Sequence, residues 1–208
     1  MRAPRILVID YEMGNLRSIA KALEALGGKV EVSSSPAAIR RADGLVIPGD
    51  GAFAEAMRRL RKLKLQAPIQ AWLKADRPFL GICLGLQVLF ETSEEFGRHA
   101  GLGAFAGRIV RFPRGARVPH MGWNLLKPRR GSWLMRKLPR QPYVYFIHSY
   151  FPLPRRAADV AAWCEYGRPF AAAVERGAVA GVQFHPEKSQ KPGLQILRNY
   201  LAMVRSRC

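Results

Sequence analysis

The chain has 208 residues, 49% of them hydrophobic and 24% charged, which is the usage of a folded globular protein and excludes disorder of the whole chain. No apolar stretch approaches 18 uncharged residues and the first ten residues lack the pattern of a signal peptide, so we expect neither a membrane span nor a cleaved leader. Lys and Arg number 34 against 15 Asp and Glu, and the resulting net charge of +19 favours acidic partners or polyanions.

The first half of the chain alternates short apolar runs with amphipathic stretches. The pattern predicts strands at residues 5–10, 29–34, 44–48 and 79–83, and helices at 15–26, 36–42, 52–64, 69–74 and 84–94. The pair Gly27-Gly28 ends the first helix, and Arg77-Pro78 ends the fourth. Strands that alternate with helices predict a parallel sheet covered by helices on both faces.

The second half is rich in glycine, proline and short β-type runs. Strands are predicted at residues 107–112, 143–150, 159–166, 170–175 and 178–184, and a final amphipathic helix at 193–205. Arg176-Gly177 between two of these strands predicts a hairpin. With no repeat and no linker, we expect a single α/β domain over residues 1–208. Its open, mostly parallel central sheet has helices on both faces, with antiparallel strands in the C-terminal half.

The sharpest local feature is the sequence GICLG, residues 81–85. A buried strand ends, Cys83 follows, and a helix begins at once, which is the arrangement of a nucleophile elbow with sulfur in place of the hydroxyl. Glycines on both sides allow the sharp turn, and the helix N-terminus stabilises a thiolate and a developing oxyanion. A buried cysteine between two packing glycines is the alternative interpretation of this pentapeptide.

The second feature is His185-Pro186-Glu187, directly after the last predicted strand. Residues two apart in an extended chain point to the same side, so Glu187 can hold the imidazole of His185 in one tautomer. Alone, this tripeptide also fits a surface turn. Together with Cys83 it makes a set of nucleophile, base and orienting carboxylate.

The remaining cysteines and histidines carry weaker signals. Cys164 lies in a predicted strand and Cys208 is the last residue, so we expect neither a disulfide framework nor a cysteine zinc site. His120 and His148 do not lie at metal-ligand spacing from a second ligand, and His99 is expected at the surface. We therefore expect no metal and no cofactor, and a cytoplasmic location.

The segments GICLGLQ, HPEKSQ and PGDG together resemble the class I (triad) glutamine amidotransferases. Within that family, MGNLRS at 13–18, VPHMGWN at 118–124 and YFIHSY at 145–150 are similar to the glutaminase subunit of imidazole glycerol phosphate synthase. The likeness extends over essentially the whole chain, from the first strand to the last helix.

The resemblance implies a role for several residues. Cys83 attacks the side-chain amide of L-glutamine, His185 transfers protons, and Glu187 orients His185. Oxyanion donors would be the N–H of Leu84 and one from Asp50 or Gly51, and the residues expected to hold glutamine are Gly49, Gln87, Ser149 and Tyr150. The ammonia would pass to a (βα)₈-barrel cyclase subunit in a heterodimer of the histidine pathway, with Asn15, Trp123 and Lys188 facing that partner.

Two residues depart from the family's pattern. Asp50 stands in the PG-x-G loop where a small or apolar residue is usual, and a carboxylate beside a developing oxyanion is unfavourable. Glu12 replaces an expected glycine in the first loop, which puts the detail of docking there in doubt. Neither change touches Cys83, His185 or Glu187.

Other functions stay open on the sequence alone. The stretch between Glu95 and Asp159 holds thirteen Lys or Arg and no acidic residue, which fits a nucleic-acid-binding module or merely a solvated basic surface. No helix-turn-helix, RRM or zinc pattern accompanies it, so we expect no specific binding of nucleic acid. A scaffold silenced by Asp50, and a relative that supplies ammonia to another acceptor such as a surface-sugar pathway, are the remaining alternatives.

Overall fold

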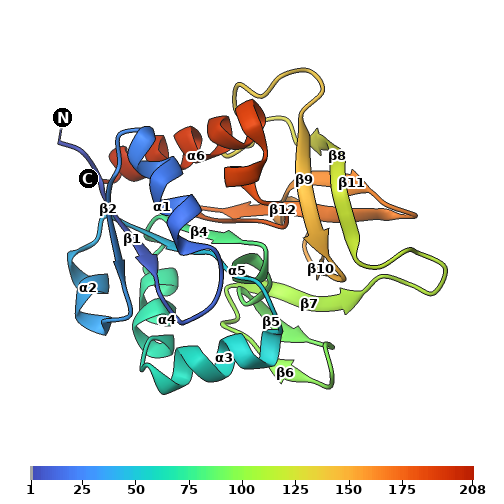
Figure 1. The fold of residues 1–208 in the computed structure, drawn as a ribbon, viewed down its shortest axis with the longest axis horizontal. Helices are drawn as coiled ribbons and strands as arrows, with labels where there is room; N and C mark the ends of the chain where they lie inside the picture. Colours follow the sequence, from blue (N-terminus) through green and yellow to red (C-terminus); the bar gives the residue numbers. More distant parts are fainter. Residues whose placement is uncertain (1) are drawn as a thin grey trace.

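A nine-stranded sheet runs through both halves of the chain (Figure 1); the computed structural model describes residues 2–208. Its strands lie in the order β2 (Lys29–Ser33), β1 (Arg5–Ile9), β3 (Gly44–Ile47), β4 (Phe79–Ile82), β13 (Val179–Val182), β12 (Pro169–Arg176), β11 (Val160–Glu165), β8 (His120–Pro128) and β9 (Tyr143–His148). The first five pair in parallel and the rest join antiparallel. The parallel and antiparallel parts therefore follow the predicted division of the chain, except that β13 from the C-terminal half pairs in parallel with β4.

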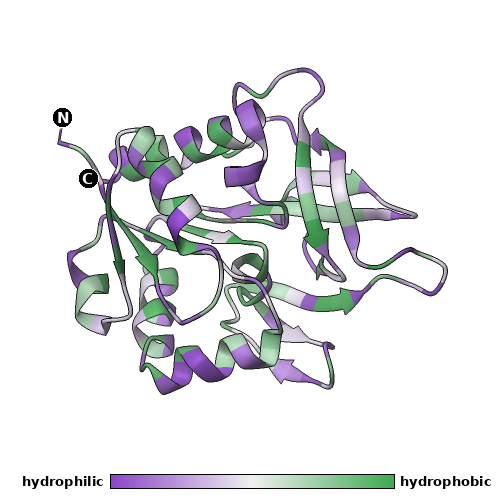
Figure 2. Cartoon of the chain, in the orientation of Figure 1, coloured by the Kyte–Doolittle hydropathy of each residue, from purple (hydrophilic) through white to green (hydrophobic). Residues whose placement is uncertain are grey.

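Alternating apolar side chains on the parallel strands supply a core on each face of the sheet. In β1, Ile6 and Val8 point to one core and Leu7 and Ile9 to the other, as the two-residue period of a strand requires. The first core is closed by α1 (Leu16–Ala25) and α6 (Gln190–Arg205), and the second by α2 (Pro36–Arg41), α3 (Phe53–Lys62) and α4 (Gln66–Lys74). Figure 2 shows the hydrophobic strands between helices whose outer faces are hydrophilic.

A second, four-stranded sheet lies beside the main one. Its order is β10 (Tyr150–Pro154), β7 (Phe105–Arg111), β5 (Phe90–Ser93) and β6 (His99–Ala100). The chain passes from the main sheet to this one at Ser149, where β9 ends and β10 begins. The expected single strand over residues 143–150 is therefore two strands in two sheets.

Most predicted elements are confirmed within a few residues, and two further predictions are wrong. The helix expected over residues 84–94 is only α5 (Leu84–Gln87), because the following residues pair with β7 as β5. Strand β8 was missed, although it pairs with β9 over six residue pairs. The last helix begins at Gln190, three residues before its predicted start. None of the helices in residues 2–208 combines the length and apolar character that a membrane crossing needs.

Candidate active site

Cys83 sits in a sharp turn between β4 and α5. Its φ of 55° and ψ of −107° lie in a region that residues with a side chain rarely adopt, so the surroundings must hold the turn in place. A Cβ on Gly81 would collide with the backbone of Gly85, and a Cβ on Gly85 would collide with the carbonyl of Ile47. Both glycines are therefore required for the close approach of strand, turn and helix that presents the thiol.

His185 and Glu187 face one another as the spacing predicts. The Nδ1 of His185 and the Oε1 of Glu187 are 2.9 Å apart, in the short 3₁₀ turn Pro186–Lys188 that follows β13. A carboxylate can only accept, so Nδ1 carries the proton and Nε2 is left as the basic nitrogen. This Nε2 is buried and has no hydrogen-bond partner in the described part of the chain.

Burial lowers the pKa of His185, but its interactions with Cys83 and Glu187 outweigh the burial and raise the pKa well above its ordinary value. The positively charged form of the His185 ring is therefore stabilised. Because the side chain of Glu187 is only 4% exposed, its charge acts on the ring with little screening by water.

Cys83 and His185 open into one cavity of about 320 Å³. A volume of this size suits a ligand as small as an amino acid. Seven residues that the sequence singled out for oxyanion, substrate or partner contacts line it as well: Asp50, Gly51, Leu84, Gln87, Ser149, Tyr150 and Lys188.

The cavity also contains residues that the sequence reading missed. Glu95, Ile147 and His148 line it, and Glu95 accepts a 2.6 Å hydrogen bond from the N–H of Phe53 at the start of α3. A larger cavity of about 540 Å³ lies near the N-terminal ends of β4 and β13, and none of its lining residues is a cysteine or a histidine. The smaller cavity is therefore the candidate active site.

The two amide protons of Gln87 are used within the protein. Its Nε2 donates to the carbonyl of Tyr150 at 3.0 Å and to Oε1 of Gln183 at 3.2 Å. The carbonyl of Ser149 likewise accepts from the N–H of Phe112 at 3.2 Å. Gln87 can therefore meet a ligand only through Oε1, and the carbonyls of Ser149 and Tyr150 are part of the wall.

The N–H of Leu84, expected as an oxyanion donor, points at the carbonyl of Gly49 at 3.4 Å. The loop that carries this carbonyl is held by a buried side chain, because the hydroxyl of Tyr11 donates to the carbonyl of Pro48 at 2.9 Å. Gly14 touches the same loop, since a Cβ there would come within 2.9 Å of the Cα of Gly49. The first loop of the chain and the candidate oxyanion loop thus form one packed unit.

The residues expected to face a partner lie in three different places. Asn15 is exposed and caps α1, accepting from the N–H of Ser18 at 3.1 Å, while Lys188 is exposed at the cavity. Trp123 is 47% exposed on β8, two residues from Met121, and Met121 lies opposite Ile147 of β9; Met121 and Ile147 are also exposed. We call Met121, Trp123 and Ile147 the β8–β9 face.

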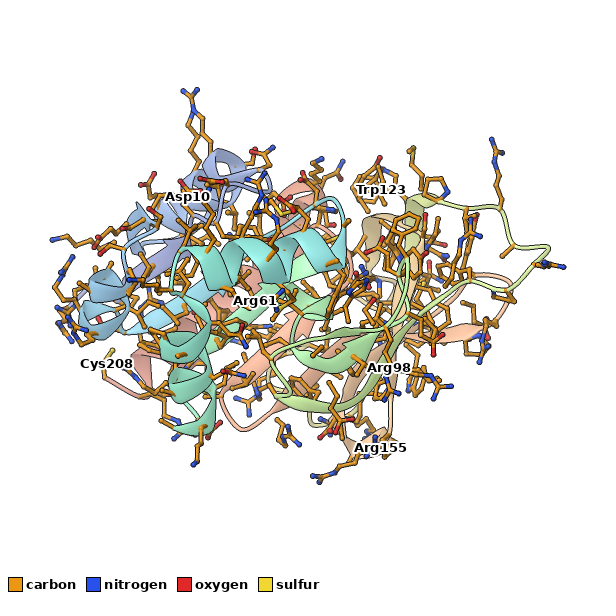
Figure 3. All side chains as sticks on the ribbon, turned by 90° about the horizontal axis from the view of Figure 1, so that it is seen from below. Asp10, Arg61, Arg98, Trp123, Arg155 and Cys208 are labelled. Carbon is orange, nitrogen blue, oxygen red and sulfur yellow. The ribbon has the colours of Figure 1, made fainter. Side chains whose placement is uncertain are left out.

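Figure 3 shows Trp123 on one edge of the molecule and Arg98 and Arg155 toward the opposite edge. These two basic residues of the stretch without acids therefore lie away from Trp123. In residues 2–208, no group of three or more His, Cys, Asp or Glu side chains is arranged to hold a metal ion.

Comparison with known proteins decides the family. The model of the family described as glutamine amidotransferase class-I matches residues 7–204. The chain belongs to the class-I glutamine amidotransferases. The predicted resemblance and the predicted fold class are thus both confirmed.

Curated relatives narrow the subfamily. The chain is 50% identical to the imidazole glycerol phosphate synthase subunit HisH of Thermosynechococcus vestitus, covering 99% of this chain and 100% of that protein. It is 48% identical to the HisH subunit of Moorella thermoacetica, over 96% of this chain and 95% of that one. Among solved structures, PurLQS from Thermotoga maritima aligns with a TM-score of 0.74 at 16% identity, over 98% of both chains, which shows the shared fold.

Proposed function

We propose that this chain is the glutaminase subunit of an imidazole glycerol phosphate synthase, acting in histidine biosynthesis. The observation that carries the proposal is the meeting of Cys83, on its strained turn, with the His185–Glu187 pair in one amino-acid-sized cavity. The named relatives, similar over almost their full length, support the choice of synthase.

In the proposed reaction the thiolate of Cys83 attacks the side-chain amide carbon of glutamine. His185, protonated on both nitrogens after taking the thiol proton, gives the Nε2 proton to the leaving nitrogen, and ammonia departs from a thioester. The same nitrogen then takes a proton from water, which attacks the thioester and releases glutamate. Glu187 keeps the ring oriented throughout and stabilises its positive charge.

The cavity also suits the charged end of glutamine, which carries an ammonium and a carboxylate. Glu95 offers a carboxylate, Lys188 an ammonium, and Gln87 an amide oxygen to the same cavity. We assign these three groups to substrate recognition, because opposite charges that line one small cavity select a zwitterion.

Hydrolysis needs the N–H of Leu84 to be released from the carbonyl of Gly49. In the structure that carbonyl occupies the place where an oxyanion would accept the bond. A turn of the peptide between Gly49 and Asp50 would exchange a carbonyl for an N–H there. We infer that the described conformation is a resting state of low activity.

The proposed partner is the cyclase subunit that the relatives' names imply, in a heterodimer. The β8–β9 face supports this proposal, because it is apolar, exposed and next to the nucleophile: the carbonyl of Ile147 lies 3.8 Å from Sγ of Cys83. Ammonia released at Cys83 has a short path to a subunit seated on that face. With Cys83, Cys164 and Cys208 all free, the reducing cytoplasm is the fitting compartment for one domain of this kind.

The experiment mixes the chain with a cyclase subunit and supplies either glutamine or ammonia. Glutamine-dependent synthesis, together with release of glutamate, is the expected result. A glutamine analogue with an electrophilic carbon in place of the amide should label Cys83 alone among the three cysteines. Labelling spread over Cys164 or Cys208, or no glutamate release with the cyclase present, would refute the proposal.

A further inference from the structure

Two histidines that the reaction does not use lie at the cavity: His148 lines it, and His120 contacts His148. His120 and His148 are directly opposite in the β8–β9 register and only 2% and 6% exposed. Their rings meet through His120 Nδ1 and His148 Nε2 at 3.0 Å. Paired buried imidazoles of this kind are expensive to desolvate, so the pair needs an explanation.

The acceptors fix where every proton in this pair lies. His148 Nδ1 is 2.9 Å from the carbonyl of Tyr150, which can only accept, so Nδ1 of His148 carries the proton. Its Nε2 is then an acceptor, so the proton of the His120–His148 bond belongs to Nδ1 of His120. The remaining Nε2 of His120 accepts from the amide of Asn124 at 3.4 Å.

Both rings are held neutral. Burial lowers the pKa of His120 to about 4 and that of His148 to about 3, so neither carries a charge near neutral pH. His120 is also clamped between Phe146 and Tyr166, with ring centroids 4.7 Å and 3.9 Å away. The direction of each hydrogen bond is therefore fixed.

The chain of bonds continues to the nucleophile. The carbonyl of Tyr150 accepts both from His148 and from Gln87, whose amide also donates to Gln183. The amide of Gln183 in turn lies 3.7 Å from Sγ of Cys83. Asn124 and His120 belong to β8 and lie on the side of the strand away from Met121 and Trp123, so the bonds extend from β8 to the thiol.

We propose that His120 and His148 are positioning residues that fix the Tyr150 carbonyl and, through it, the amide of Gln87 in the substrate wall. We call Asn124, His120, His148 and the Tyr150 carbonyl the histidine relay. The histidine relay orients the side chain of Gln87 so that Oε1 of Gln87 is presented to the substrate. Both amide protons of Gln87 are already donated, to the carbonyl of Tyr150 and to Oε1 of Gln183. The inference rests on the proposed glutaminase function and adds two residues to it.

The test compares two substitutions at one position. An asparagine amide reproduces the place of Nδ1 and a glutamine amide the place of Nε2, so His148→Asn keeps the donor to Tyr150 and His148→Gln loses it. For glutamine hydrolysis in the cyclase complex, we expect KM within about twofold of wild type for His148→Asn. For His148→Gln we expect KM about tenfold higher, the effect of one buried hydrogen bond, with kcat changed much less.

His120→Phe keeps the aromatic clamp but removes the donor to His148, and we expect it to raise KM by about fivefold. Tyr166→Phe is the matched control, because it alters the other side of the clamp and removes only a bond to the carbonyl of Arg117. Equal KM values for the two His148 variants, or a rise for Tyr166→Phe as large as for His120→Phe, would overturn the proposal.

A second measurement does not depend on activity. Nitrogen NMR of the chain with labelled histidines should show both rings neutral and protonated on Nδ1 at neutral pH. As a separate control, ammonia-dependent synthesis by the complex should be unchanged in every variant. A proton on Nε2 of either ring would refute the relay. If the wild type hydrolyses no glutamine with the cyclase present, the proposed function fails, and the NMR result still decides whether the relay exists.

Discussion

Replacing His120 by phenylalanine should make the fold less sensitive to acid. The ring of His120 is only 2% exposed, and its burial lowers its pKa to about 4. In the unfolded chain the same ring titrates near its ordinary value of about 6.5. Below that value the unfolded chain binds more protons than the folded one, so stability is present above pH ~6.5 and lost as the pH falls toward ~4.

The size of the effect follows from the two pKa values. The cost approaches about 1.4 kcal/mol for each pH unit between them, so lowering the pH from about 7.5 to about 4.5 removes about 2.5 kcal/mol through His120 alone. That is a large share of the ~5–15 kcal/mol by which a typical domain is stable. Phenylalanine fills the same space between Phe146 and Tyr166 and binds no proton.

Urea unfolding at about pH 7.5 and about pH 4.5 measures the effect in both proteins. The free energy of unfolding should fall by about 2.5 kcal/mol more in the wild type than in His120→Phe over this range. Groups present in both proteins, including His185 with its raised pKa, cancel in the comparison. An equal acid loss in the two proteins would refute the reasoning that His120 is buried and neutral.

Three further predictions concern activity and association. Cys83→Ala should lower glutamine-dependent synthesis by about 10⁴-fold or more and leave ammonia-dependent synthesis intact. Cys164→Ala, in a buried strand, should change neither activity. Residual glutaminase activity in Cys83→Ala would contradict the assignment. Asp50→Val removes a carboxylate at the cavity and should raise glutaminase activity without the cyclase by about tenfold, so an unchanged rate in a folded variant would count against that role. The net charge of +19 predicts that association with the cyclase slows as salt rises, measured by stopped flow. A flat salt dependence, with DNA binding that survives physiological salt, would instead favour a nucleic-acid function.

The parallel half of the fold could be predicted because its signals are local. Apart from the alternating β2, each strand of the first half is a short apolar run, and the helices carry their own periodicity. The run Val88-Leu89-Phe90 carries no such signal, since an apolar triplet fits a helix or a strand equally. Phe90 is in a strand because it pairs with Phe105, which lies in another segment of the chain. Pairing over distance overrides local preference there.

The Cys83 turn and the His185–Glu187 pair could be found from sequence because each is contained in a few adjacent residues. The His120–His148 pair could not, because 28 positions separate the two rings and only the register of β8 and β9 brings them together. Glu95 was missed for the same reason, since nothing around it marks a binding residue. The segments PHMGWN and YFIHSY did carry the two histidines, so the signal was present without its geometry.

The chain passes from one sheet to the other at Ser149, so the candidate substrate wall is built from residues of both sheets. His148 ends a strand of the large sheet and Tyr150 begins a strand of the small one, and both line the cavity. Shear of one sheet against the other would therefore widen or narrow the cavity without a separate lid. Such collective motions occur on microsecond to millisecond timescales. We therefore expect the relative motion of the two sheets to set the rate at which substrate enters the cavity.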